Sequence, residues 1–357
     1  MKKLTLLKSM LLLCALVAGS GSVWADETET SPFSTAAGQA ALDIVKAGTS
    51  STGGDLELKQ GYFTYTSAKG YDKSNELNIY AGGTLTITLD ASVNGYIKSV
   101  KVTYTNSYPF ETPTGWSATS DQSPWSTDSK MSAGKYIQYS TDATNVTSVD
   151  LVNKAGGKTG PRTIEITYVV NSISSTIDAT YGWATFCSKV PLDFTGTGVS
   201  AYIITGVSGA SIVSSAVNKV PANTGILVTG STANIPITTA ATDDVTGNCL
   251  KGITGKKTTV STDAGYTNYV LSVNGGKAVF QSIGATDAIV PVGKAYLQIA
   301  SGGAHEFLLI DEGSTGISSV NQTDVMKTNG IYNLSGLRVK QPTKGMYIMN
   351  GKKFIVK

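Results

Sequence analysis

The chain has 357 residues, of which 41% are hydrophobic and only 15% are charged, with a formal net charge of +3. Three of the basic residues, Lys2, Lys3 and Lys8, lie in the first 25 residues, and the remainder of the chain carries 25 basic and 25 acidic residues. Nucleic-acid binding needs a cationic face that displaces counterions from phosphates, so a neutral chain argues against this function.

Residues 1–25 are typical of a secretory signal peptide. Basic residues come first, the apolar run Met10 to Ala18 follows, and Val23-Trp24-Ala25 supplies a cleavage sequence before Asp26. The apolar run is too short to span a bilayer. We therefore expect the protein to be exported.

The composition beyond the signal predicts an all-β protein, because Thr, Ser, Val, Ile, Gly and Tyr are abundant and suit a pleated, half-buried surface. Residues 26–54 are poor in aromatic side chains and predict a flexible leader. Within this leader, the segment Ala36–Gly48 is compatible with a short helix or with an edge strand. Residues 55–171 contain short runs that alternate apolar and polar residues between turn residues, which predicts a β-sandwich domain.

A Ser-rich joint, Val170–Thr176, leads to a second series of short strands at residues 175–313, which predicts a second sandwich-like domain. A linker at residues 314–329 and a tail at residues 330–357 complete the expected organisation. Val220-Pro221 and Val290-Pro291 each precede a glycine and an apolar run. Proline cannot join a β-ladder, so each pair marks a strand entry, through internal pseudo-symmetry or through shared turn chemistry.

The sequence shows no recognisable set of catalytic residues. His305 is the only histidine, and no nucleophile-elbow sequence accompanies it. The adjacent acids Asp243 and Asp244 would point to opposite faces of a strand. One histidine and the cysteines Cys187 and Cys249 provide no cluster of zinc ligands. We therefore predict no enzyme activity, no cofactor and no metal site.

Two further features leave alternatives open. The segment Tyr71–Glu76 offers Asp72, Ser74, Asn75 and Glu76 as oxygen ligands for calcium, although a solvated turn explains the same residues better. Cys187 and Cys249 are compatible with a disulfide in an exported protein or with two free thiols.

The candidate ligand-binding segment is the loop Ser107–Ser126, whose prolines and turn residues argue against a regular strand. Tryptophan rings on loops can stack against the apolar face of a sugar, and nearby polar side chains can bind its hydroxyl groups. The alternative is that the tryptophans fill the end of the sandwich core. The predicted ligand-binding residues are Tyr108, Trp116, Asp121, Gln122 and Trp125, and Phe110 is a further aromatic side chain of this loop.

The tail combines "GIYNLSGLRV" with "KGMYIMNGKKFIVK" and contains six basic residues and no acid. It predicts three short strands, with hairpin turns at Leu334–Leu337 and at Asn350-Gly351. This tail resembles the C-terminal sorting domain of exported Bacteroidota proteins, the Por or type IX secretion tail. The resemblance implies that the outer-membrane secretion machinery is a partner and that the protein is secreted or attached to the outer-membrane surface. The matching residues are Tyr332, Leu334, Gly336, Arg338, Gly345, Tyr347, Gly351, Lys352 and Lys353.

The body of the chain resembles β-rich modules of Bacteroidota surface proteins. The second series matches through "YGWATFCSKVPLDF", "VPANTGILVTG", "VTGNCL" and "PVGKAYLQI", and the first matches a companion sandwich through "IKSVKVTYT" and "PRTIEITYVV". Neither resemblance brings a catalytic residue. The sequence therefore predicts a non-enzymatic, exported cell-surface protein that binds a glycan or an extracellular or host protein through its first sandwich. The alternative is a structural spacer or adhesin unit, and a glycan-active enzyme ranks last.

Overall fold

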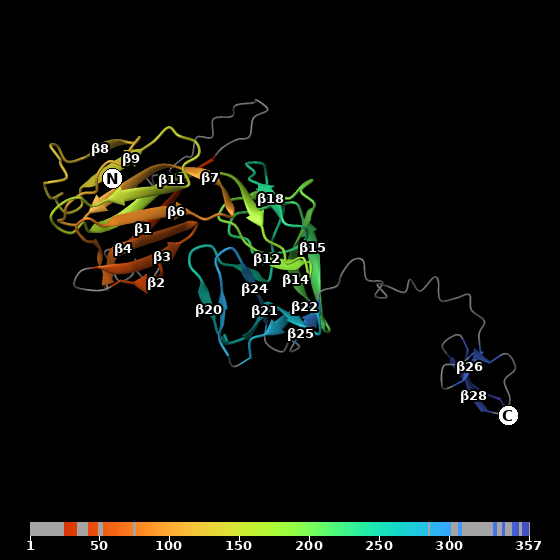
Figure 1. Cartoon of the computed structure of the whole chain (residues 1–357). Coiled ribbons are helices and arrows are strands. Elements are labelled where there is room, and N and C mark those ends of the chain that lie inside the picture. The colour runs from red at the N-terminus through yellow and green to blue at the C-terminus, as the bar shows by residue number, and fades with distance from the viewer. Residues whose placement is uncertain are drawn as a thin grey trace, which may run out of the picture. The chain divides into compact units, whose positions relative to one another are not determined.

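The computed structural model describes residues 25–33, 42–48, 53–73, 76–284, 286–300, 306–308, 331–333, 338–339, 345–349 and 352–356. All the regular secondary structure in these residues is β-strand (Figure 1), which confirms the expected all-β fold. None of these residues forms a helix long and apolar enough to cross a membrane. The chain divides into two compact units, residues 1–309 and residues 310–357.

The first unit begins with a β-sandwich of two six-stranded sheets. The β11 sheet has the order β1-β11-β7-β9-β8, and β18 pairs with the end of β11. The β4 sheet has the order β10-β6-β4-β3-β2, and β5 also pairs with β4. The strands of the β11 sheet are β1 (Ala25–Pro32), β7 (Val93–Tyr104), β8 (Ser117–Ser120), β9 (Tyr136–Ser140), β11 (Pro161–Ser175) and β18 (Ala233–Pro236). Those of the β4 sheet are β2 (Asp43–Ala47), β3 (Gly54–Gln60), β4 (Phe63–Lys73), β5 (Glu76–Ile79), β6 (Thr84–Leu89) and β10 (Ser148–Val152).

The two sheets meet through alternate side chains, as the period of a strand requires. In β6, Leu85, Ile87 and Leu89 are buried, whereas the residues between them are not. Phe63 of β4 meets Tyr168 of β11 edge-on, with 5.0 Å between the ring centroids. The alternating runs of residues 55–171 therefore supply most of the strands of these two facing sheets, and β1, β2 and β18 come from outside this range.

The expectation of a flexible leader at residues 26–54 is wrong for the part of it that the structure describes. β1 pairs with β11 from Ala25↔Val170 to Pro32↔Thr163, and the Ser31 hydroxyl is 2.7 Å from the Tyr65 hydroxyl. β2 is the edge strand of the β4 sheet, so Asp43–Ala47, the part of the ambiguous segment Ala36–Gly48 that forms β2, is an edge strand and not a helix. The strand β1 was missed because its sequence, ADETETSP, has no apolar alternation. Its pairing with β11 needs only backbone hydrogen bonds.

The predicted joint between two domains is also wrong, because residues 170–175 belong to β11. Ser172, Ile173 and Ser175 are buried, and Ile173 pairs with Ile235 of β18, a strand from the second series. One continuous apolar cluster, the shared core, extends from the sandwich into residues 177–235. The sandwich and the first part of the second series therefore share a core, whereas later strands of the second series pack in separate apolar clusters.

The second series forms a nine-stranded sheet, which we call the curled sheet, and two two-stranded ribbons, β13–β16 and β20–β23. The order of the curled sheet is β12-β17-β14-β15-β25-β22-β21-β24-β19. Its strands are β12 (Trp183–Phe186), β14 (Val199–Ser208), β15 (Ser211–Val217), β17 (Ile226–Gly230), β19 (Leu250–Gly252), β21 (Tyr266–Asn274), β22 (Lys277–Ser282), β24 (Ala295–Ala300) and β25 (Glu306–Leu308). The ribbon strands are β13 (Leu192–Asp193), β16 (Lys219–Val220), β20 (Thr258–Val260) and β23 (Ala288–Val290).

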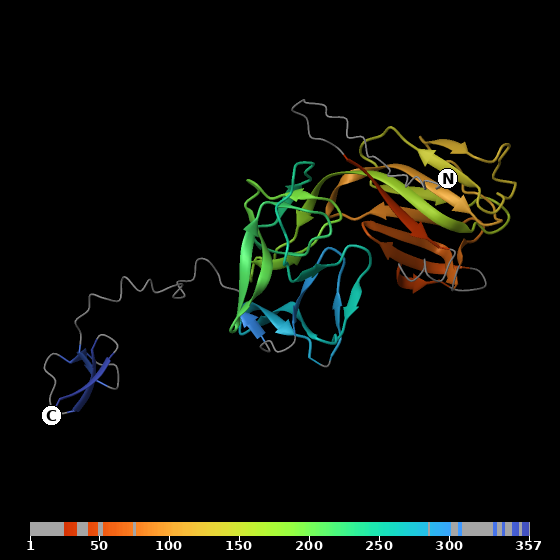
Figure 2. The ribbon, with the colours of Figure 1, turned by 180° about the vertical axis from the view of Figure 1, so that it is seen from behind.

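The curled sheet turns back on itself instead of forming two facing sheets (Figure 2). The Cys249 amide at the start of β19 donates to the Ile204 carbonyl of β14 at 2.7 Å, and the Cys187 amide after β12 donates to the Gly293 carbonyl before β24 at 2.9 Å. In β17, Leu227 lies in the cluster inside the curled sheet, whereas Ile226 and Val228 lie in the shared core. Because both faces of β17 are buried, its sequence is an unbroken apolar run.

The two Val-Pro segments occupy equivalent places. Pro221 follows β16 and precedes β17, and Pro291 follows β23 and precedes β24, so both lie at strand entries as predicted. Two residues after each proline the backbone has a positive φ, 61° at Asn223 and 80° at Gly293. The Asn223 amide donates to the Ser188 carbonyl at 2.7 Å, so both turns bind the segment that follows β12.

The second unit is a small antiparallel sheet with the order β27-β26-β28-β29. The sequence predicted three strands, and the fourth was missed because β27 has only two residues. The pairing of Met349 with Lys352 leaves two residues between β28 and β29, as the predicted turn at Asn350-Gly351 requires. The strands are β26 (Ile331–Asn333), β27 (Arg338–Val339), β28 (Gly345–Met349) and β29 (Lys352–Val356). Leu334, Gly336 and Gly351 lie outside the described residues.

Candidate functional site

The predicted ligand loop lies beside the edge of the β11 sheet and is more regular than expected. Residues 117–120 form β8, which pairs with β9, although the prolines and turn residues argued against a strand. Trp116 and Trp125 are half-buried and pack against the shared core, and Phe110 is fully buried within it. The tryptophans therefore have the structural role of the alternative interpretation, while keeping part of their surface in solvent.

Asp121 and Gln122 are occupied by the loop itself. The Asp121 carboxylate accepts a hydrogen bond from the Tyr136 amide at 2.8 Å and lies 3.5 Å from the Lys135 ammonium. The Gln122 side-chain oxygen accepts from the Ser132 amide at 2.8 Å. These two side chains fix the connection between β8 and β9, so their oxygens are already used.

Tyr108 is held between a cation and the backbone. The Lys130 ammonium lies 5.8 Å from the centroid of its ring. A Cβ atom on Gly157 would come within 2.6 Å of the same ring, so the ring packs closely on the Gly157 backbone. This packing leaves Tyr108 in a fixed position at the base of the loop.

A hollow of about 310 Å³ lies next to Trp116, and we call it the Trp116 hollow. Three hydroxyl-bearing residues, one acidic residue and one tryptophan line it, from β8 and the residue before it, from β9 and from the residues that follow β9. Asp142 is exposed, and pairing of Ser117 with Ser140 brings the two strands together. The lining residues are Gly115, Trp116, Ser117, Ser140, Thr141 and Asp142.

Sequence reasoning found Trp116 but missed its polar neighbours. Ser140, Thr141 and Asp142 are more than twenty positions later in the chain, and only the β8–β9 pairing brings them to Trp116. Trp125 does not line this hollow, and no ring contact joins it to Trp116 among the residues that the structure describes. The structure therefore separates the two predicted tryptophans.

The acidic side chains of the second series stabilise turns. The Asp243 carboxylate accepts from the Asn218 amide at 2.6 Å and from the Lys219 amide at 3.1 Å. Hydrogen bonds from Thr246 lower the pKa of Asp244. Both acids lie in an irregular segment, not on a strand as the sequence suggested. Across the described ranges, no group of three His, Cys, Asp or Glu side chains could hold a metal ion.

Other predicted features lie partly outside the described residues. His305, Ser74 and Asn75 are in this category, and for Asp72 and Glu76 only the backbone of the β4–β5 hairpin is described. The side chains of the four candidate calcium ligands therefore lie outside the part of the chain that the structure describes.

Both Cys187 and Cys249 are free thiols. Burial raises the pKa of the Cys187 thiol to about 12 and also raises the pKa of Cys249, which is only half-buried. Neither thiol has the lowered pKa of a catalytic nucleophile.

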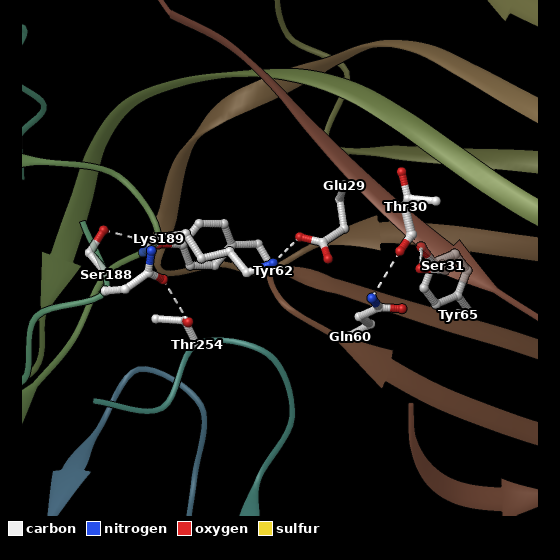
Figure 3. Close-up of polar contacts among 10 residues, drawn as sticks. Glu29, Thr30, Ser31, Gln60, Tyr62, Tyr65, Ser188, Lys189 and Thr254 are labelled. Carbon is white, nitrogen blue, oxygen red and sulfur yellow. Dashed lines mark hydrogen bonds and ion pairs between the residues drawn. The ribbon is translucent and has the colours of Figure 1, made fainter. Parts of the chain in front are cut away.

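A polar cluster joins the sandwich to the curled sheet (Figure 3). The Tyr62 hydroxyl accepts a hydrogen bond from the Lys189 amide at 2.9 Å and lies 3.1 Å from the Ser188 hydroxyl. The Lys189 ammonium also forms an ion pair with Glu29 of β1. Burial is the largest cause that raises the pKa of Tyr62 to about 12, so this hydroxyl is not a proton-transfer group near neutral pH. The cluster is a structural junction.

Gly61 makes this junction possible. Its φ is +56°, and a Cβ atom there would lie 2.5 Å from both the Glu29 carboxylate oxygen and the Lys189 ammonium. Its amide donates to the Gly255 carbonyl at 2.7 Å, which adds a backbone link between the sandwich and the curled sheet. The positive φ favours glycine at this position, and a Cβ atom would force the ends of the Glu29 and Lys189 side chains to move.

Comparison of the chain with protein-family models, curated proteins and solved structures gave no match. Within the predicted loop, the Trp116 hollow brings a partly exposed aromatic side chain next to polar residues.

Proposed function

We propose that the chain is an exported, non-enzymatic binding protein whose first sandwich binds a glycan in the Trp116 hollow. The observation that supports this proposal is the half-buried indole beside Ser140, Thr141 and Asp142. An indole fixed by core packing presents a rigid apolar surface to the C–H face of a sugar ring. The hydroxyl and carboxylate groups can donate to and accept from sugar hydroxyls.

The size of the hollow limits the ligand. A volume of about 310 Å³ is at the low end for small-molecule sites and suits one sugar ring, with the rest of the glycan outside. Asp121 and Gln122 are engaged by the loop, so recognition falls to Asp142 and the hydroxyls of the lining, those of Ser117, Ser140 and Thr141. Because Asp142 is the only charged group of the lining, the preferred glycan is neutral or cationic and not acidic.

A glycan array tests the site. Trp116→Ala should abolish retention of the purified protein on glycans that the wild type binds. Trp125→Ala is the matched control, because Trp125 is also half-buried against the shared core but does not line the hollow. Asp142→Asn, at an exposed position, should weaken binding without changing the melting temperature. Equal loss of retention in the Trp116 and Trp125 variants would assign the effect to folding and reject the site.

The proposed location depends on the two ends of the chain. The first 25 residues direct export, and the tail from Gly330 directs passage across the outer membrane to the cell surface. Deletion of residues 330–357 should leave the protein in the periplasm of the source cells, where fractionation and immunoblotting would detect it. The same surface fraction in the deletion strain and the parent would reject the sorting role.

A structural spacer or adhesin unit is the second candidate, and one observation favours it. The shared core and the Tyr62 junction join the sandwich and the curled sheet in one compact unit, which suits a part that transmits force or holds other domains apart. This candidate predicts no retention of the wild type on any glycan, together with attachment defects in cells that lack the gene.

A further inference from the structure

The curled sheet carries a second hollow, of about 470 Å³, that is separate from the Trp116 hollow. It lies between β12 on one side and β21, β23 and the start of β24 on the other. Most of its wall is apolar, and one of these side chains, Ile289, is 64% exposed. The main apolar residues of the wall are Trp183, Val270, Leu271, Ile289, Val290 and Pro291.

One cation lines this apolar hollow. Lys294 is partly buried, and burial alone lowers the pKa of its ammonium group. Among the described residues no carboxylate pairs with Lys294. Asp178 also lines the hollow and keeps its charge, but it is exposed to solvent, and its carboxylate accepts a hydrogen bond from the Thr180 amide at 2.7 Å.

An unpaired cation in an apolar site is costly unless a counter-charge arrives with the ligand. The geometry points to a small organic anion as the occupant: a monocarboxylate with an apolar body, whose carboxylate meets Lys294 and whose body covers Trp183 and Leu271. This ligand class and this site both go beyond the proposed glycan function.

The polar groups of the hollow disfavour a sugar as the ligand. The Thr185 hydroxyl accepts a hydrogen bond from the Ala295 amide at 3.2 Å, which engages one of its two lone pairs. The many hydroxyls of a sugar would lack partners against Val270, Leu271 and Ile289, whereas an alkyl or aromatic body loses nothing there. The Trp183 ring is itself held by a tilted contact with Tyr202, with 6.1 Å between the centroids, so the wall is preformed.

Isothermal titration calorimetry with octanoate tests the proposal on the purified full-length mature protein. Octanoate should bind at a single site, and Lys294→Met should weaken it about tenfold, since a charge-assisted contact is lost. Lys277→Met, at an exposed lysine of β22 away from the hollow, is the matched control and should bind octanoate as the wild type does. 1-Octanol should bind Lys294→Met and wild type equally.

A second variant separates loss of the site from loss of folding. Ile289→Glu places a carboxylate at the exposed edge of the hollow, where folding is little affected, and should repel octanoate but not octanol. Three results would overturn the proposal: no octanoate binding by the wild type, the same octanoate affinity in wild type and Lys294→Met, or binding of glucuronate in preference to octanoate.

Discussion

Lys189 forms an ion pair with Glu29, a residue 160 positions earlier in the chain. Glu29 lies on β1 at the edge of the sandwich, and Lys189 follows β12 of the curled sheet (Figure 3). The side chain of Glu29 is 7% exposed and that of Lys189 is 21% exposed. Because both charges are largely removed from water, either one alone would be poorly solvated.

Removal of one partner of this ion pair should destabilise the first unit. We expect Glu29→Gln to lower the free energy of unfolding by about 2 kcal/mol, less than for a fully buried pair because Lys189 keeps some contact with water. The double variant with Lys189→Met should lose less than the sum of the two single variants. Urea denaturation followed by circular dichroism measures the four proteins of this cycle.

The control for this cycle is a second ion pair on the same strand. Asp26 pairs with Lys98 at 2.7 Å, and their side chains are 51% and 41% exposed. Lys98→Met should therefore change the free energy of unfolding by less than ~0.5 kcal/mol. Additive effects of Glu29→Gln and Lys189→Met would show that the buried pair has no coupling and contradict this account.

The parts of the fold that the sequence predicted are those with a strong local pattern. Leu85, Ile87 and Leu89 alternate with threonines in β6, and such strands were predicted. β1 was missed because strand pairing needs only a backbone, and its side chains carry no alternation that marks it. β17 was predicted as a strand, but its unbroken apolar run does not reveal that each face packs against a different core.

The candidate site could be predicted only in part for a similar reason. The sequence places Trp116 near Asp121 and Gln122, and nearness in sequence suggested that they act together. A carboxylate or amide beside a turn more often binds its own backbone, as the bonds to Tyr136 and Ser132 show. The distant polar neighbours of Trp116 come from the last residue of β9 and the two residues after it, and register between strands cannot be read from local composition.

Replacement of Gly61 should be more harmful than replacement of a comparable turn glycine. Gly61→Ala imposes both a strained positive φ and a collision with the Glu29–Lys189 ion pair. Gly196 also has a positive φ, of 72°, but nothing lies within 4 Å of the position of its Cβ. We expect Gly196→Ala to cost about 1 kcal/mol for the backbone alone, and Gly61→Ala about twice as much.

Thermal or urea unfolding of the two glycine variants gives this comparison directly. The difference between them isolates the collision, because both substitutions carry the same backbone strain. The double variant of Gly61→Ala with Lys189→Met should lose less stability than the sum of the two single variants, because the Lys189 ammonium is one of the colliding groups. If the two glycine variants lose equal stability, the close approach at Gly61 has no energetic effect.

The buried tyrosines predict loss of stability in alkali. Burial is the largest cause that raises the pKa of Tyr62 from 10.0 to about 12, and burial also raises the pKa of Tyr65 and of Tyr104. A folded-state pKa above the unfolded value means that the stability is fully present below pH 10 and falls as the pH rises toward the folded pKa. The native protein should therefore keep these phenols protonated at pH 11 and unfold as they ionise.

Absorbance at 295 nm, recorded with circular dichroism during an alkaline titration, measures this behaviour. Late phenol ionisation should coincide with loss of β-sheet signal, and Tyr62→Phe should reduce the late absorbance change by one phenol. Tyr62→Phe also leaves the Lys189 amide without its acceptor, so the variant should be about 1–2 kcal/mol less stable at pH 7. Complete phenol ionisation by pH 11 in a protein that stays folded would contradict the burial of these hydroxyls.

The two cysteines should differ strongly in reactivity. Cys187 is 2% exposed. Its sulfur lies 2.2 Å from the position that a Cβ atom on Gly252 would take, so the thiol packs directly on the backbone of β19. Burial raises the pKa of its thiol to about 12, which removes the reactive thiolate.

Cys249 is half-buried and should react with Ellman's reagent in the native protein, whereas Cys187 should react only after unfolding. The Cys187→Ala variant identifies the slow thiol by its absence. Failure of both thiols to react in denaturant without a reductant, followed by reaction after reduction, would reveal a disulfide and contradict the free thiols of the structure.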